Sequence, residues 1–309
     1  MQQIGRFQRI RRGGWAAGLA LLLAPVALEA QAATAGDSTW APVERALGRH
    51  GTMQPGDVYK FSLPRSDLVV RVGGVRVRPA LALGSWVAFR RMGDSAMAMG
   101  DLVLTEAEVG PVMAKLQAMG VSQTAVHHHI LHETPRVTYM HIAATGDPVR
   151  IAEAIRAAVA LTKTPSAARS PAASSAFALD TARIATTLGH AGKVNGGVYQ
   201  VSNPRADTIR EGGMDVPPAM GVASAINFQP TGGGKVAITG DFVLTADEVN
   251  PVIQALRGAG IGVTALHNHM LRDEPRLFFI HFWANDDSGK LAQGLRLALD
   301  RTNSLKSGT

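Results

Sequence analysis

The chain has 309 residues, of which 46% are hydrophobic, and a formal net charge of +7 without any cysteine. This length allows about two domains with real cores, and the lack of a thiol excludes disulfides, thiolate metal sites, cysteine nucleophiles and a lipid-modified cysteine. Beyond the first residues lysine and arginine form no clustered run, so we expect no nucleic-acid partner.

Residues 1–32 have the pattern of a signal peptide. Four arginines between residues 6 and 12 precede an apolar stretch from Trp15 to Leu28, and Ala30-Gln31-Ala32 offers a small-residue cleavage site. The apolar stretch is shorter than the about 20 residues that a transmembrane helix needs. We therefore expect export by the Sec or twin-arginine route and a periplasmic or secreted protein of net charge +4, with no transmembrane segment after cleavage.

The rest of the chain contains an internal repeat, with two similar copies in tandem. "GDLVLTEAEVGPV" from Gly100 returns as "GDFVLTADEVNPV" from Gly240, and 19 of the 42 positions from Gly100 to His141 are identical at this spacing. Between the copies lies a stretch rich in proline, serine and alanine, which is typical of a flexible linker. We expect homologous domains at 38–163 and 179–306, a linker at 164–178, and pairing of the two repeats within the chain.

Each copy predicts the same elements in the same order. "LALGSWVAF" and "VASAINF" read as strands, and the next strand ends in "GDLVL" or "GDFVL". A capping box then starts a helix at Thr105 and at Thr245, so Glu108 and Glu248 are expected as capping groups rather than general bases. A hairpin over 121–144 and a helix from Pro148 follow, with Glu133-Thr134-Pro135 as the hairpin turn. The order strand, strand, helix, strand, strand, helix predicts an α+β fold in which each mostly antiparallel sheet carries helices on one face.

Histidines gather on the two strands of this hairpin. His127 and His129 share one face because side chains alternate along a strand, whereas His128, which Asn268 replaces in the second copy, points the other way. A three-residue turn would place His127 opposite His141, while a four-residue turn would remove His141 from the group. The second copy repeats the pattern. The six candidate metal ligands are therefore His127, His129, His141, His267, His269 and His281.

Three histidines from two neighbouring strands can hold zinc with one position open, and zinc is favoured here over copper. Asp101 or Asp241 is a candidate fourth ligand, although nothing in the sequence places either nearby. The alternative is that the imidazoles only line a half-buried sheet and bond to the backbone.

Two further groups of side chains have the chemistry of ligand sites. Arg136 and Arg276 follow the turn proline and are weak candidates for binding an anionic ligand. The methionines of the first copy are expected in the core, because copy two replaces two of them by Ala237 and Thr239. These methionines are Met92, Met97 and Met99.

The strings "LPRSDL", "PALALGSWVAF", "GDLVLTEAEVGPVMAKL", "TAVHHHILHETPRVTYMHI" and "TALHNHMLRDEPR" resemble the LppY/LpqO family of secreted bacterial proteins. The resemblance covers about residues 50–163 and 190–303. It implies kinship with a domain of unknown function and no catalytic residues. The lipid anchor that the family name implies is not inherited, because the chain has no cysteine.

The sequence leaves two classes of function open. The first is a non-catalytic envelope protein that binds a small ligand or a metal ion across the histidine-bearing sheets. The second is a zinc-dependent hydrolase in which the histidines hold an ion that activates water.

Overall fold

A computed structural model describes residues 39–166 and 177–305. The predicted signal peptide (1–32) and residues 167–176 of the predicted linker lie outside the described residues. In the first repeat the elements are α1 (Ala41–Leu47), β1 (Thr52–Gln54), β2 (Val58–Pro64), β3 (Arg71–Val72), β4 (Val75–Arg76), α2 (Pro79–Ala82), β5 (Gly84–Met92), β6 (Ser95–Thr105), α3 (Glu106–Ala118), β7 (Ser122–His127), β8 (Glu133–Thr134), β9 (Val137–Gly146) and α4 (Pro148–Val159).

The second repeat has the same order of elements. They are α5 (Thr181–Leu188), β10 (Gly192–Asn195), β11 (Val198–Pro204), β12 (Arg210–Glu211), β13 (Met214–Asp215), the 3-10 helix η1 (Pro218–Met220), β14 (Ala223–Gly232), β15 (Lys235–Leu244), α6 (Ala246–Gly258), β16 (Gly262–His267), β17 (Asp273–Glu274), β18 (Phe278–Asp287) and α7 (Ser288–Leu299). No helix among the described residues is long and apolar enough to cross a bilayer.

Each repeat forms a six-stranded sheet in which the paired strands run antiparallel. The strand order is β1-β2-β5-β6-β9-β7 in the first repeat and β10-β11-β14-β15-β18-β16 in the second. Two small sheets, β4-β3-β8 and β13-β12-β17, lie beside them. The predicted α+β fold is confirmed. Two short helices and four strands precede the first predicted strand of each repeat, and β8 and β17 lie within the predicted hairpins. One strand start was predicted too early, because Pro79 begins α2 and β5 starts only at Gly84.

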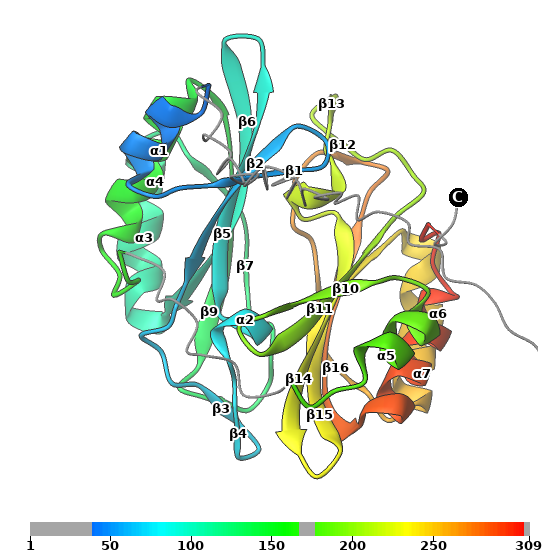
Figure 1. Ribbon diagram of the computed structural model, residues 1–309. Helices are drawn as coiled ribbons and strands as arrows, with labels where there is room; N and C mark the ends of the chain where they lie inside the picture. The colour runs from blue at the N-terminus through cyan, green and yellow to red at the C-terminus, as the bar shows by residue number, and fades with distance from the viewer. Residues whose placement is uncertain (1–38, 167–176, 306–309) are drawn as a thin grey trace, which may run out of the picture. The chain divides into compact units, whose positions relative to one another are not determined.

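Both faces of each sheet are covered. Helices α1, α3 and α4 pack on one face of the first sheet, and α5, α6 and α7 pack on one face of the second (Figure 1). The opposite faces meet each other, since two buried clusters contain side chains from both repeats, including Met97 with Phe279 and Tyr139 with Val198. Residues 96–104 of β6 are buried at every position, as expected for a strand with both faces covered. The repeats therefore share a core.

The capping boxes form as predicted. The Thr105 hydroxyl accepts from the backbone of Glu108, whose carboxylate accepts from the Thr105 N–H at 2.8 Å, and Thr245 and Glu248 repeat this arrangement. Glu108 and Glu248 are thus used as capping groups at helix starts.

A buried arginine ties each helix start to the sheet, which the sequence did not predict. Arg65 is fully buried and donates to Asp67 at 2.8 and 2.9 Å, to Glu108 at 2.8 Å and to the Val103 carbonyl at 2.7 Å. Arg205 makes the same contacts to Asp207, Glu248 and the Val243 carbonyl in the second repeat. In the sequence, this cluster is visible as the repeated arginines and aspartates at residues 65, 67, 205 and 207 and as the repeated glutamates Glu108 and Glu248.

The glycine before each "GD" aspartate allows two strands to approach closely. A Cβ added at Gly240 would lie 1.9 Å from the Ala225 carbonyl oxygen, and one added at Gly100 would lie 2.7 Å from that of Trp86. Both distances are shorter than any tolerable contact, so only glycine fits in front of Asp101 and Asp241.

Candidate metal centre at the contact between the repeats

The six predicted histidines lie together where the two sheets face each other. We call His127, His129, His141, His267, His269 and His281 the histidine cluster. Three imidazole pairs cross from one repeat to the other with ring centroids 3.7 Å apart: His127 with His267, His129 with His281, and His141 with His269. Of the two arrangements that the repetition left open, two separate sites or one site shared between the repeats, the structure shows the histidines of both repeats in one cluster.

The predicted hairpin register is wrong, although its consequence holds. His127 pairs with Tyr139 and Ala125 pairs with His141, rather than His127 with His141. The connection is longer than the expected three-residue turn because β8 leaves the hairpin to pair with β3. The register moves by an even number of residues, so His127 and His141 keep the same face of the sheet. Their ring centroids are 5.1 Å apart.

Two aspartates complete the cluster. Asp101 on β6 is the cross-strand partner of His141, and Asp241 on β15 is the partner of His281. Asp101 oxygens lie 3.8 Å from His129 Nε2 and 3.9 Å from His141 Nε2. The candidate fourth ligands of the sequence analysis are thus brought into the cluster by the pairing of β6 with β9 and of β15 with β18.

The second repeat also places its aspartate beside two of its histidines, but the aspartate faces Nδ1 of His281, whereas in the first repeat it faces Nε2 of His141. Asp241 oxygens lie 3.5 Å from His269 Nε2 and 3.6 Å from His281 Nδ1. His281 Nδ1 also lies 2.8 Å from the Gly240 carbonyl oxygen, which accepts a hydrogen bond when this nitrogen carries the proton. Each repeat therefore places one carboxylate beside two of its own imidazoles.

Reciprocal hydrogen bonds hold the loops that carry His129 and His269. The Thr124 hydroxyl donates to the His269 carbonyl at 2.6 Å, and the Thr264 hydroxyl donates to the His129 carbonyl at 2.5 Å. Each repeat thus positions a histidine of the other. Only their repetition at a spacing of 140 distinguishes these threonines in the sequence.

Burial keeps the imidazoles neutral. Desolvation lowers the pKa of His141 to about 3, that of His267 to about 2 and that of His281 to about 4. Burial, followed by neighbouring imidazoles, also lowers the pKa of the other three histidines. Neutral imidazole is the form that binds metal ions, because one ring nitrogen then has a free lone pair.

Burial is the largest influence on the pKa of the two aspartates. Burial raises the pKa of Asp101 to about 7, although the charge of Lys60 opposes this shift. Burial, together with the charge of Asp101, raises the pKa of Asp241 well above its ordinary value. A nearby cation would reverse the effect of burial on both groups.

Many polar atoms of the cluster have no hydrogen-bond partner. They are Asp101 Oδ1, His127 Nδ1, His129 Nε2, His141 Nε2, Asp241 Oδ1 and His267 Nδ1. Leaving one buried polar group unpaired costs about 1–3 kcal/mol. So many unpaired atoms in one place indicate that the cluster is built to bind something.

Four groups of side chains in the cluster could hold a metal ion, with ligand atoms within 4.8 Å of one another. Two are equivalent sets of one repeat each, namely Asp101, His129 and His141, and Asp241, His269 and His281. The other two cross between the repeats and include His127. Buried histidine groups of this protein could therefore bind metal.

Other predicted residues lie away from these sets. His128 Nδ1 lies 2.8 Å from the Val137 carbonyl, and the Asn268 amide donates to the Leu277 carbonyl at 2.8 Å, so both bond to the backbone. Arg136 is exposed, and the exposed Arg276 donates to Asp273 at 2.6 Å. The use of these arginines by an anionic ligand stays a prediction.

The methionines behave as predicted. Met97 and Met99 are buried in the shared core, and the half-buried Met92 packs against it. This supports core packing as their main role.

Comparisons with known proteins agree with the duplication. The family model described as Domain of Unknown Function (DUF1259) matches residues 41–161 and 182–301. No curated protein matches the chain.

Two solved shell proteins show a weak likeness. The trimeric bacterial microcompartment shell protein PduB is 12% identical, with 84% of this chain and 96% of that chain covered and a TM-score of 0.23. EtuB from Clostridium kluyveri is 9% identical, with 82% and 90% covered and a TM-score of 0.19. Scores this low carry no argument about fold or function.

The two segments that match the family model span most of the sequence, so the chain belongs to the DUF1259 family and carries two tandem copies of its domain.

Proposed function

We propose that this chain is a non-catalytic metal-binding protein that holds two divalent ions in the histidine cluster, one beside Asp101 and one beside Asp241. The observation that carries the proposal is the spacing of the aspartate and histidine atoms. Aspartate oxygens lie 3.5 to 3.9 Å from the Nε2 atoms of His129, His141 and His269, and these separations exceed ordinary hydrogen bonds. A tetrahedral ion with bonds of about 2.1 Å holds its ligand atoms about 3.4 Å apart.

The donor atoms favour zinc. Each set offers two neutral imidazoles and one carboxylate, which are common ligands of this ion. Binding would also supply partners for buried atoms that now have none, and would favour the charged form of two carboxylates that burial makes costly to ionise. His127 and His267 add further nitrogen donors between the two sets.

The proposed place of action is the cell envelope. Support comes from residues 1–32, whose arginines, apolar stretch and small-residue site follow the order of a secretory signal. The resemblance to the LppY/LpqO family also supports this location, because the named members of that family are secreted proteins.

Zinc-dependent hydrolysis is the second candidate function. It is favoured by the position of an aspartate beside each histidine pair, because an ion held by three protein ligands and one water molecule can activate that water. Against it, the cavity that borders His141 and His269 measures about 10 Å³, which is room for about one water molecule. The described residues thus offer little space for a substrate there, so binding is the better-supported function.

Metal analysis of protein purified without a histidine tag tests the proposal. After loading with zinc and desalting, we expect two zinc ions per chain, one for each equivalent set. In the presence of the same concentration of a competing chelator, the double variant Asp101→Asn with Asp241→Asn should retain about one tenth of the zinc that the wild type retains, or less. A matched control replaces Asp94 and Asp247, which are exposed, and should keep both ions.

Two results would overturn this function. One is loaded wild-type protein that retains no zinc after desalting, and the other is equal zinc in both double variants. Cleavage of p-nitrophenyl acetate that requires zinc and is lost in the Asp101→Asn, Asp241→Asn variant would instead support the hydrolase.

A further inference from the structure

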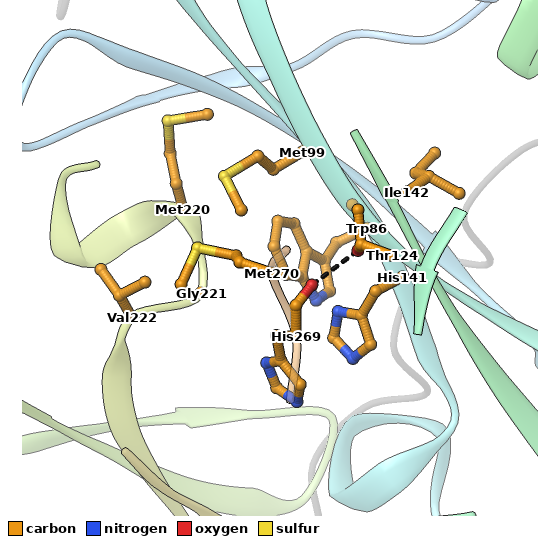
Figure 2. A pocket seen from close by; sticks show the side chains of 11 residues that line it. Trp86, Met99, Thr124, His141, Ile142, Met220, Gly221, Val222, His269 and Met270 are labelled. Atoms are coloured by element: carbon orange, nitrogen blue, oxygen red, sulfur yellow. Dashed lines mark hydrogen bonds between the residues drawn. The ribbon is translucent and has the colours of Figure 1, made fainter. Parts of the chain in front are cut away.

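We propose a second metal site, for one soft monovalent ion such as copper(I), in the small cavity lined by the thioethers of Met99, Met220 and Met270. This site goes beyond the zinc centre, which it adjoins through His141 and His269. The cavity has a volume of about 10 Å³, which is room for a single small ion or water. Figure 2 shows the three methionines on one side of this space and the two imidazoles on the other.

Three separate parts of the chain bring the thioethers together. Met99 lies on β6, Met220 is the last residue of η1, and Met270 directly follows His269. All three are buried, with exposed fractions of 7%, 1% and 1%. The site therefore needs both repeats, as the histidine cluster does.

The equivalent place in the other half of the molecule has no such lining. Trp86 pairs with Asp101 across β5 and β6, and Ala225 pairs with Asp241 across β14 and β15, so Ala225 takes the place of Trp86. Thr239 stands two residues before Asp241 as Met99 stands before Asp101. The repeats agree at the histidines and aspartates and differ beside them.

Met270 also has no methionine as its counterpart in the other repeat. Ile130 follows His129 just as Met270 follows His269. Isoleucine, alanine and threonine fill the equivalent region without sulfur, so packing alone does not require a group of thioethers. At the compared positions, methionine occurs only on the side of the cavity that adjoins His141 and His269.

The chemistry of the donors selects the ion. Thioethers are soft ligands that favour copper(I), whereas carboxylate and imidazole suit divalent zinc. The nearby ammonium of Lys60 lies 4.0 Å from the centroid of the Trp86 ring and donates to the Ala219 carbonyl at 3.0 Å. That ring is thus engaged by a cation already, and the proposed ion relies on sulfur rather than on the indole.

Silver(I) tests the site because it is a soft monovalent ion that needs no reducing agent. Zinc-loaded, tag-free full-length protein would be titrated with silver nitrate in chloride-free buffer, desalted and analysed for both metals. We expect one silver ion per chain, retained while zinc remains bound. Replacing Met99, Met220 and Met270 by leucine should weaken silver binding at least about tenfold and leave the zinc content unchanged.

The chain offers a matched control for this triple variant. Met92, Met97 and Met140 do not line the cavity, so their replacement by leucine should leave silver binding intact. Exchange of methionine for leucine conserves volume and is usually tolerated. If the cavity triple variant does not fold, Met99→Thr, which introduces the residue of the second repeat, is expected to weaken silver binding on its own.

Three outcomes would overturn the thioether site without contradicting the zinc centre. One is a wild-type protein that keeps zinc and retains no silver. Another is equal silver binding by the two triple variants, and the third is silver that enters only as zinc leaves. Loss of both metals from wild-type protein would instead contradict the zinc centre as well.

Discussion

Replacing Arg65 by methionine is expected to lower the free energy of unfolding by about 3–5 kcal/mol, because removal of one partner of a buried ion pair leaves the other uncompensated. The variant loses the hydrogen bonds that Arg65 donates to Asp67, Glu108 and the Val103 carbonyl. Urea unfolding followed by circular dichroism measures the loss. Arg205→Met should cost a similar amount in the second repeat, where the contacts are the same.

The control for this prediction is Arg150→Met on the exposed side of α4, which should change stability by less than about 0.5 kcal/mol.

The effect of Arg65→Met should also depend on pH. Burial alone would raise the pKa of Glu108, but hydrogen bonds from Arg65 and Thr105 lower it below its ordinary value of 4.5. Its contribution is therefore present above pH 4.5 and is lost as pH falls below that value. An effect of Arg65→Met no larger than that of Arg150→Met would contradict the structural role.

Zinc is expected to stabilise the chelator-treated protein by about 4 kcal/mol for each ion when free zinc is a thousand times its dissociation constant. The ligand atoms come together only in the folded chain, so the folded state binds zinc far better than the unfolded state. Urea unfolding with excess zinc and with excess chelator gives the difference.

The same comparison in the Asp101→Asn, Asp241→Asn variant separates specific binding from general salt effects. We expect its zinc-dependent stabilisation to fall by more than half, while its stability in chelator stays close to that of the wild type. The second expectation follows because burial makes the two carboxylates costly to ionise in the metal-free protein. Identical unfolding of the wild type with zinc and with chelator would contradict the prediction.

Features that depend on neighbouring residues could be predicted from the sequence. The capping boxes at Thr105 and Thr245 needed only the spacing of threonine and glutamate. The alternation of side chains along a strand was enough to separate His128 from its neighbours. The internal repeat, visible as two similar copies of one sequence segment, predicted the division into two similar α+β units.

Features that depend on long-range pairing could not be predicted. The loop after His127 sends β8 to pair with β3, and no local pattern announces a pairing with residues some sixty positions earlier. Asp101 reaches His141 only through the register of β6 and β9. The merging of the two histidine patches depends on which sheet faces are left uncovered by helices, and this is a property of the packed repeats rather than of either copy.

Arg65 shows a different limit of sequence reasoning. Its recurrence as Arg205 was visible, yet an arginine between strands is usually solvated, and only the fold shows that it lies under the helix cap. The asymmetry around Met99 was visible too, as a replacement by Thr239. The sequence did not show that Met220 and Met270 from the other repeat lie in the same cavity.

The positions of bound ions test the zinc centre most directly. Crystals of the zinc-loaded protein, measured on both sides of the zinc absorption edge, should give two anomalous peaks per chain. We expect one peak among Asp101, His129 and His141 and the other among Asp241, His269 and His281. Zinc peaks confined to surface histidines such as His50 or His190, or a map without peaks in the cluster, would contradict the account.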